Sequence, residues 1–425
     1  MFVGDLIGKR ALYSPNALAV VDASHPSHPH YTYAQLNERA NRLAYWLRFE
    51  AGIMKGDRVA ILAHNSVAYL DAFFACSKIG AILTCLNWRL HWQETLELIH
   101  HTQPRVLCFS QDFSDAVLHI SDLASCLEEF INLDEVEAHD EDIFTPYHDL
   151  LSSVPHFPVL EDGLTDEDTA CLLFSGGTLH APKPVRISHR MIAWNVLNTV
   201  LHDLRVGDVT VNVFPMFHSG GLLVHTLPLL ILGGTVILPR KFDASHVVDL
   251  LERYRCTVFA AVPTVYQRLP ETPHWDNAVL SSLRYALNGG APLADALIAR
   301  YQQEKGVNIR QGFGTTEFGP GAFTLQSDTP TPSQSIGRPS FFTDARVVDV
   351  HNQALPPHQV GELVVRGRAI TSGFYPAQTE PLDEEGWFHT GERAYYDEAF
   401  YFYLLTQDGQ PTPNLKRLGN PSVSL

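Results

Sequence analysis

Hydrophobic and polar positions follow two different spacings along the chain. Thr32 and Gln35 form a capping-box pattern, and the apolar residues that follow, up to Leu47, recur every three or four positions. This spacing predicts an amphipathic helix. The continuous apolar run from Arg58 to Ala63 predicts a buried strand instead. A helix followed by an interior strand is typical of an α/β protein.

The same alternation continues further along the chain. Asn65 or Ser66 is expected to cap a helix that ends near Gly80, and Ala81 to Leu86 is predicted to form the next strand. A helical pattern from Gln93 to His101 is followed by another apolar run. Strands joined through helices pair in parallel, with helices on both faces of the sheet. The first part of the chain is therefore predicted to be a doubly wound layer.

A second α/β run begins near Thr169. Strands are predicted around Val209 to Phe214 and around Thr235 to Leu238, with helical spacing between later strands. After Pro330 the pattern changes to short β-type runs, such as Gly361 to Gly367, separated by proline and glycine turns. This change indicates a smaller all-β unit.

The predicted fold class is α/β, with two doubly wound α/β subdomains and a small distorted β-barrel. The predicted division places the first α/β subdomain at residues 1–168 and the second, with the nucleotide and acyl site, at 169–330. The β-barrel-like subdomain is expected at 331–398, and a short tail at 399–425.

Composition excludes several classes of function. The 425 residues, 45% of them hydrophobic, suffice for more than one compact unit. A formal net charge of -17 argues against nucleic acid or an anionic membrane as the main partner, because such binding needs a basic surface. The N-terminus lacks the apolar core of a secretory signal. The most apolar stretch, 221–239, is interrupted by proline, glycine and histidine, so no transmembrane segment is expected.

The six cysteines show no CxxC spacing. We therefore expect reduced and mostly buried thiols, as in a cytoplasmic protein.

The segment with the densest chemistry is Gln-Gly-Phe-Gly-Thr-Thr-Glu, at 311–317. Gly312 and Gly314 would let the backbone approach a ligand closely, Phe313 offers a flat apolar face for a purine, and Glu317 offers hard oxygen atoms to Mg²⁺. The segment predicts a loop that binds a nucleotide and a metal. A glycine-rich turn between two strands is the other interpretation, and both stay open at this point.

A second glycine-rich segment runs from Phe174 to His189, directly after an apolar run that predicts a strand. Backbone N–H groups and hydroxyls in such a loop can face a phosphate, and Lys183 would add positive charge. The Gly-Lys-Ser/Thr ending of a Walker P-loop is absent. An ordinary flexible turn would have the same composition.

Five segments together are more specific than any one of them. They are 174–189, 214–220, 288–293, 311–317 and 386–392. In this order and approximate spacing they resemble the adenylate-forming superfamily of acyl-CoA synthetases, luciferases and peptide-synthetase adenylation domains. The resemblance covers roughly residues 1 to 398.

The resemblance implies a two-step reaction. A carboxylate attacks the α-phosphate of ATP to give an acyl-adenylate and pyrophosphate, and a thiol of CoA or of a carrier protein then displaces AMP. The first step needs stabilisation of phosphate charge and in-line positioning, which glycine-rich loops, Mg²⁺ and a lysine supply. ATP, Mg²⁺, a carboxylic acid and CoA or an acyl carrier protein are therefore the expected ligands and partners.

The resemblance also implies roles for the matching residues. Phe313 matches the aromatic residue that stacks on adenine, Thr316 the hydroxyl that contacts phosphate, and Glu317 the carboxylate linked to Mg²⁺. His218 matches a residue at the mouth of the acyl pocket, although a histidine satisfied inside the core would give the same sequence. The predicted catalytic residues are Lys183, His218, Thr316 and Glu317. The predicted nucleotide-binding residues are Ser175, Gly176, Gly177, Thr178, Gly289, Gly290, Ala291, Gly312, Phe313, Gly314, Thr315 and Glu392. Residues that either shape the acyl cavity or belong to the plain core are Trp194, Phe217, Val262 and Pro263.

The chain departs from the family pattern in its phosphate loop. The family reads Thr-Ser-Gly-Thr-Thr-Gly-x-Pro-Lys-Gly, whereas Gly176 and Leu179 here replace two hydroxyl residues, and His180 and Pro184 replace two glycines. Each lost charge-assisted hydrogen bond removes about 1.5–3 kcal/mol, so we expect a weaker grip on phosphate. Glu392 stands where the family has an aspartate that holds the ribose hydroxyls.

The end of the sequence also differs from the family. The segment from Asp397 lacks the arginine and lysine of the family's Arg-x-Lys-Asp hinge, and the family's mobile C-terminal domain is not expected in the residues that follow. Closure of that domain normally prepares the site for thioester formation. The leading hypothesis is therefore a carboxylate-activating enzyme of acyl-CoA synthetase type with impaired thioester formation. The alternatives are a non-catalytic module that binds an acyl group or nucleotide, and a scaffold that depends on a partner protein.

Overall fold

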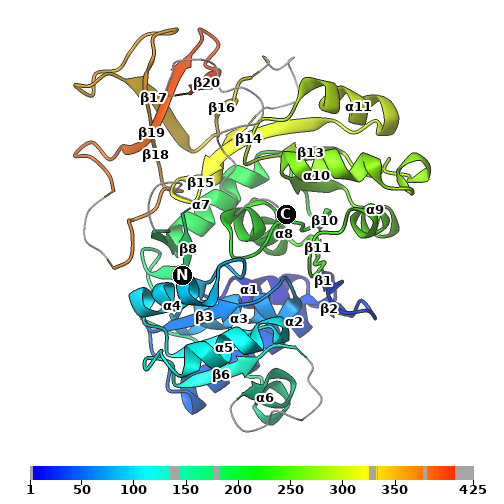
Figure 1. Ribbon diagram of the computed structural model, residues 1–425, viewed down its shortest axis with the longest axis vertical. Helices are drawn as coiled ribbons and strands as arrows, with labels where there is room; N and C mark the ends of the chain where they lie inside the picture. Colours follow the sequence, from blue (N-terminus) through cyan, green and yellow to red (C-terminus); the bar gives the residue numbers. More distant parts are fainter. Residues whose placement is uncertain are drawn as a thin grey trace.

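The computed structural model describes residues 3–134, 144–175, 182–324, 332, 334–376 and 381–406. Within these residues the strands form four sheets, which stack from the N-terminal α/β layer at one end to an antiparallel sheet at the other (Figure 1). This arrangement confirms the predicted α/β class.

The N-terminal layer is built on a seven-stranded sheet with the order β7-β6-β5-β3-β4-β8-β9. Its strands are parallel except for β9, which is antiparallel to β8. The strands are β3 (Arg58–Leu62), β4 (Ile82–Cys85), β5 (Val106–Phe109), β6 (Glu129–Asn132), β7 (Thr145–Pro146), β8 (Thr169–Phe174) and β9 (Pro184–Ser188). The helices that follow or precede them are α2 (Tyr33–Tyr45), α3 (Val67–Ile79), α4 (Trp92–Thr102), α5 (Ser114–Ser121) and α6 (Tyr147–Ser153).

Alternate residues of β3 belong to different apolar clusters. Val59 and Ile61 pack in the cluster that contains α2 and α3, whereas Ala60 and Leu62 pack in the cluster that contains α4 and α5. Because successive strand residues point to opposite faces, both faces of the sheet are covered by helices. The first layer is therefore doubly wound, as the sequence pattern predicts.

Two further sheets form the middle of the molecule. One has the order β10-β11-β1-β2 and the other the order β12-β13-β14-β15-β16, and an isolated parallel bridge between Asn212 and Ala260 connects them. The strands are β1 (Leu18–Val21), β2 (His30–Thr32), β10 (Val209–Val211), β11 (Thr235–Ile237), β12 (Val258–Ala261), β13 (Tyr285–Asn288), β14 (Ile309–Thr315), β15 (Gly319–Thr324) and β16 (Arg338–Pro339). The helices are α1 (Leu6–Tyr13), α7 (His189–Val200), α8 (Thr226–Leu232), α9 (Ala244–Arg253), α10 (Pro263–Arg268) and α11 (Asp295–Lys305). Short helical turns are η1 (Trp46–Glu50), η2 (Gln111–Phe113), η3 (Gly220–Val224), η4 (Leu269–Glu271) and η5 (Trp275–Asn277).

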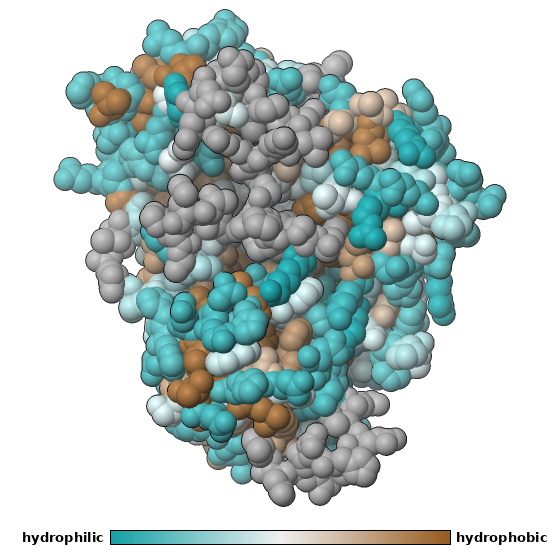
Figure 2. All heavy atoms as spheres, viewed as in Figure 1, coloured by the Kyte–Doolittle hydropathy of each residue, from teal (hydrophilic) through white to brown (hydrophobic). Residues whose placement is uncertain are grey.

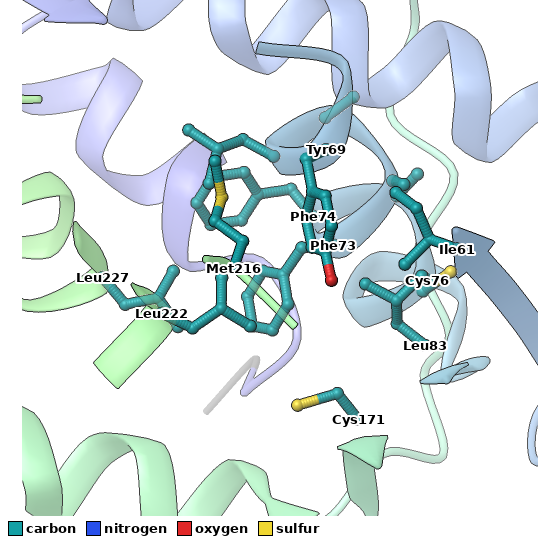
Figure 3. Packing of buried hydrophobic residues seen from close by; sticks show 14 of the residues in the cluster. Ile61, Tyr69, Phe73, Phe74, Cys76, Leu83, Cys171, Met216, Leu222 and Leu227 are labelled. Carbon is teal, nitrogen blue, oxygen red and sulfur yellow. The ribbon is translucent and has the colours of Figure 1, made fainter. Parts of the chain in front are cut away.

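The N-terminal and middle parts share one continuous core. Figure 3 shows Met216 and Leu222 lying beside Phe73 and Phe74 of α3, and all four belong to one buried cluster. β8 and β9, which follow residue 168, pair in the N-terminal sheet, while β1 and β2 pair in a middle sheet. The chain thus crosses between the sheets more than once, and the division at 168, 330 and 398 stays a prediction.

The last sheet is antiparallel, with the order β17-β18-β19-β20. Its strands are β17 (Thr343–Val348), β18 (Gly361–Gly367), β19 (Phe388–Tyr396) and β20 (Phe402–Leu405). Trp387 lies between the guanidinium groups of Arg346 and Arg366, 4.1 and 4.5 Å from the ring centroid. The all-β character expected after residue 330 is therefore present.

All six cysteines are free thiols, and five of them are buried, as the sequence predicts. None of the helices in the described part of the chain is long and apolar enough to cross a membrane. Hydrophilic side chains cover much of the face in Figure 2, with apolar groups scattered among them.

Candidate functional site

One cavity of about 490 Å³ lies where strands from two of the sheets end. Its walls include Cys85 at the end of β4, Ser175 after β8, Val262 after β12 and Gly289 after β13. Ligands of parallel α/β sheets bind outside the carboxyl ends of the strands. The cavity occupies that position.

The hairpin between β14 and β15 supplies the most polar wall of the cavity. Thr315, Thr316 and Glu317 all line it. The buried Thr316 donates a 3.4 Å hydrogen bond from its hydroxyl to that of Ser219, and the hydroxyl of Thr315 accepts one of 3.2 Å from the Glu317 N–H. These contacts hold the two hydroxyls and the backbone that carries the Glu317 carboxylate at the cavity surface.

A second carboxylate reaches the cavity from β19. The hydroxyl of Thr390 donates to the Leu363 carbonyl at 2.6 Å and accepts from the Glu392 N–H at 3.1 Å, so the backbone that carries Glu392 is fixed to β18. Glu392 lines the cavity and is half-buried, and its burial raises the pKa of its carboxyl group. Two acidic side chains, Glu317 and Glu392, thus face one cavity.

Replacing Glu392 with glutamine is expected to stabilise the fold at alkaline pH. Because burial raises the pKa of Glu392 in the folded protein, its ionisation favours the unfolded chain, and stability falls as pH rises through the folded-state pKa. The variant E392Q should be more stable than the parent at pH 8, with a difference that shrinks as the pH falls towards about 4.5, the pKa of the carboxyl group in the unfolded chain. Urea denaturation at several pH values measures this, and equal stability at pH 8 would contradict it.

Other parts of the cavity lining are apolar. They are formed by Phe214, Phe217, Val224, Ala260, Val262 and Leu287. Such a lining favours the carbon skeleton of a ligand over its charged groups. We call the polar lining at the hairpin the polar arm, and the apolar lining that includes residues of β12 and β13 the apolar arm.

His218 lines the cavity next to Phe217. Burial, with a smaller effect of the Arg89 charge, lowers the pKa of His218 to about 4. Its Nδ1 accepts a 3.1 Å hydrogen bond from the Gly220 N–H, so the neutral ring carries its proton on Nε2. At neutral pH His218 is a hydrogen-bond donor without charge.

The ring of Phe313 is not part of the cavity lining. Phe313 lies on the strand face opposite to that of Gly312 and Gly314, because successive strand residues alternate in direction. Its ring is buried with Phe318 and Phe323, at centroid distances of 5.9 and 5.8 Å, in the core of the C-terminal sheet. Gly312 and Gly314 line the cavity, whereas the Phe313 ring packs in the core, and its contact with a purine stays a prediction.

The segment 311–317 has the form of the other interpretation, a glycine-rich turn between two strands. Residues 309–315 belong to β14, and β15 begins at Gly319. A Cβ atom on Gly314 would lie 2.0 Å from the Gly319 carbonyl oxygen, so the close approach of the two strands requires this glycine. The segment is thus a tight hairpin whose turn faces the cavity.

The other residues predicted for the site either line the cavity, lie outside its lining, or belong to the part of the chain that is not described. Ser175, Gly289 and Gly290 line the cavity. Lys183 is exposed, with its ammonium group 5.5 Å from the centroid of the Phe374 ring, and its carbonyl accepts a hydrogen bond from the Ser175 N–H. Ala291 lies in the turn after β13, where its carbonyl accepts from the Asn288 side chain at 2.7 Å. Gly176, Gly177 and Thr178 lie outside the described residues.

Of the four residues predicted to shape the acyl cavity or to belong to the core, two line the cavity and two do not. Phe217 and Val262 line the cavity. Trp194 packs edge-on against Phe342, with ring centroids 5.1 Å apart, and Pro263 is buried at the first turn of α10. Cavity residues to which the sequence gave no individual role are Asn87, Phe214, Ala260, Leu287 and Thr390, among others. The strand-end rule could have indicated Ala260 and Leu287, but the others reach the cavity only through the tertiary fold.

Comparison with known proteins shows a consistent set of relatives. The family model of AMP-binding enzymes matches residues 8–375. The chain is 35% identical to a feruloyl-CoA synthase of an Amycolatopsis species, over 93% of this chain and 77% of that protein. It is 30% identical to an indoleacetate–CoA ligase of Aromatoleum aromaticum, over 88% of this chain and 72% of that protein.

Solved structures match the fold closely. The inhibitor-bound N-terminal domain of FACL13 from Mycobacterium tuberculosis is 27% identical, with a TM-score of 0.87 over 95% of this chain and 99% of that chain. ATP-bound MatB from Rhodopseudomonas palustris is 24% identical, with a TM-score of 0.84 over 96% and 79%. The likeness to MatB concerns the fold alone.

Proposed function

The chain belongs to the family of AMP-binding enzymes and is an AMP-forming acid–thiol ligase of the acyl-CoA synthetase type. We propose that the two arms of its cavity bind the two substrates of the first reaction step. The polar arm at Thr315, Thr316 and Glu317 receives the phosphates of ATP. The apolar arm receives the carbon skeleton of a carboxylic acid. The acid carboxylate and the α-phosphate then meet between the arms.

The observation that carries this proposal is the joining of both arms in one cavity. The hydroxyls and carboxylates of β14, β15 and β19 and the apolar residues of β12 and β13 line the same space. Holding two reactants in one site converts a bimolecular reaction into an effectively unimolecular one. The shared lining supports condensation of an acid with a nucleotide in this cavity.

Glu317 suits a magnesium ion that arrives with ATP. In the described part of the chain no cluster of three or more His, Cys, Asp or Glu side chains could hold a metal by itself. Mg²⁺ in nucleotide sites is usually held by one or two carboxylates together with substrate phosphates. One carboxylate beside two hydroxyls fits that mode, and the ion would supply charge neutralisation on the phosphates.

The residues of the chain itself position the reactants. We assign Thr316 to hold a phosphate oxygen, Glu392 to accept hydrogen bonds from the ribose hydroxyls, and the Nε2–H of neutral His218 to orient the acid. The lowered pKa of His218 keeps this ring uncharged, so it donates without forming an ion pair with the carboxylate. The acid is thereby left free to act as the nucleophile.

The thiol acceptor is CoA, in keeping with the relatives that are named as CoA synthases and ligases. We further propose a cytoplasmic location, which the free thiols support. A carrier protein is the alternative acceptor that the sequence interpretation left open.

Acid-dependent ATP–pyrophosphate exchange tests the proposed function. A panel of aromatic, aliphatic and amino acids should contain at least one that supports exchange, and adding CoA should convert that acid to its thioester with release of AMP. Calorimetry with ATP should show binding in the same preparation. Binding of ATP without exchange for any acid would favour the non-catalytic module instead.

A further inference from the structure

The helix α7 carries apolar side chains on its outer face as well as on its inner one. Its inner face packs in the core of the protein through Met191 and Val196. On the outer face Ala193, Leu197 and the C-cap residue Leu201 follow one another at intervals of four residues, so they lie in one line along the helix. All three are exposed, Leu197 to 45% and Leu201 to 47%. A helix that is apolar on all sides is normally covered on all sides.

Aromatic residues extend this line of side chains. The ring of Trp194 packs edge-on against that of Phe342, with centroids 5.1 Å apart, and the Phe342 ring contacts that of Phe341 at 5.0 Å. Phe341 is 80% exposed. The Asn198 side chain accepts a 3.0 Å hydrogen bond from the Phe342 N–H, which fixes the aromatic segment to α7. We call this surface the α7 patch, and its members are Ala193, Trp194, Leu197, Leu201, Phe341 and Phe342.

The α7 patch has no charged side chain of its own, and charged groups at its two ends are paired. Residues 191–202 contain no Asp, Glu, Lys or Arg. At the N-terminal end of α7, Arg368 lies 5.6 Å from the centroid of the Trp194 ring and pairs with Asp166 at 3.3 Å. At the C-terminal end, Arg205 pairs with Asp203 at 2.9 Å. An apolar centre with a polar rim is the usual anatomy of a protein–protein interface.

We propose that the α7 patch binds a second copy of this chain, with the two α7 helices antiparallel about a two-fold axis near Leu197. A chain with a net charge of -17 repels its own copies, and the repulsion is weakest where two surfaces carry only paired charges. The two-fold arrangement places the Arg368–Asp166 pair of each copy opposite the Asp203–Arg205 pair of the other, so that unlike charges can meet. A strongly charged partner would find no excess of opposite charge at this patch.

The size of the α7 patch sets the expected strength of the dimer. Stable interfaces bury about 800 Å² on each partner, whereas apolar patches on the surface of monomers cover about 300–600 Å². Six side chains can supply the apolar centre, and the rest of the contact must come from the polar rim. We therefore expect a reversible dimer with a Kd in the micromolar range.

Sedimentation velocity of the full chain over about 1–200 µM tests the proposal. The parent should pass from monomer to dimer over this range. Leu197→Glu and Phe341→Glu should each weaken dimerisation by at least about 30-fold, the usual effect of losing a central apolar residue of an interface. The matched control is Val350→Glu, because Val350 is 93% exposed, lies outside the α7 patch and receives the same charge. This control should dimerise like the parent, and thermal unfolding should show that all three variants keep the fold.

A cross-link gives a positive readout of the same geometry. Two copies of Leu197 lie beside each other if the two-fold axis passes near this residue. Leu197→Cys should therefore form an intermolecular disulfide when the thiol oxidant diamide is added, whereas Val350→Cys should not. The parent supplies the background of this experiment, and five of its six cysteines are buried.

Three results would overturn the proposal. The first is a parent chain that stays monomeric at the highest concentration. The second is a dimer that survives both L197E and F341E. The third is a dimer that is lost in Phe49→Glu instead, which would place the interface at the exposed aromatic cluster of Tyr45, Phe49 and Phe157. Each result can be read without ATP or an acid, so the test does not depend on the proposed function.

Discussion

Glu317→Gln is expected to reduce acid-dependent ATP–pyrophosphate exchange by about 100- to 1,000-fold. The substitution keeps the size of the side chain but removes the negative charge at the polar arm of the cavity. Without that charge, a metal ion that accompanies ATP would lose the carboxylate that we propose to hold it, and charge on the transferring phosphoryl group would be less well stabilised. Calorimetry at fixed Mg²⁺ should show weaker binding of ATP as an independent readout.

The matched control for this variant is Glu97→Gln. Glu97 is an exposed glutamate of α4 that does not line the cavity, and its replacement makes the same change in net charge. Full activity of E97Q together with loss in E317Q would assign the effect to the site. Full activity of both variants would contradict the role of Glu317.

Acidification is expected to unfold the protein well before its carboxylates are protonated. His64, His189 and His202 are buried, and desolvation lowers the pKa of each to about 4, with nearby cations adding to the effect for His64 and His202. Burial likewise lowers the pKa of His225 to about 3. Protonation therefore favours the unfolded chain, so the stability is complete above pH 6.5 and is lost as the pH falls towards 4.

The expected loss of the free energy of unfolding on acidification is large. At pH 5 each such histidine reduces the free energy of unfolding by about 2 kcal/mol, or roughly 8 kcal/mol for the four together. Domains are typically stable by about 5–15 kcal/mol. Urea denaturation between pH 7.5 and 5 measures the loss. His202→Gln should reduce the decrease of the free energy of unfolding with falling pH, whereas His351→Gln, at an exposed position, should not. A constant free energy of unfolding down to pH 5 would contradict these buried neutral histidines.

Local patterns along the chain predicted much of the fold. The capping box at Thr32 and Gln35 is present, with both of its hydrogen bonds, and β18 has the bounds 361–367 of the predicted run. These features depend on neighbouring residues only. The pairing of β1 with β11 joins residues far apart in sequence, and no local pattern encodes it.

The sequence could predict those site residues that directly follow a strand along the chain. The segments around Ser175, Gly289 and Thr316 do converge on one cavity. The ring of Phe313 lies away from the lining of this cavity because strand alternation turns it towards Phe323. Phe214 belongs to the segment 214–220 that the sequence indicated, but its place at the cavity depends on a tertiary contact, the hydrogen bond from the Asn65 side chain to its carbonyl.

A crystal structure of the enzyme with the acyl-adenylate formed from ATP and its preferred acid is the most direct test of the shared cavity. We expect the phosphate beside Thr316, the ribose within hydrogen-bond distance of Glu392, and the acyl group beside β12 and β13. An adenylate bound elsewhere, or one whose acyl group points away from β12 and β13, would contradict it.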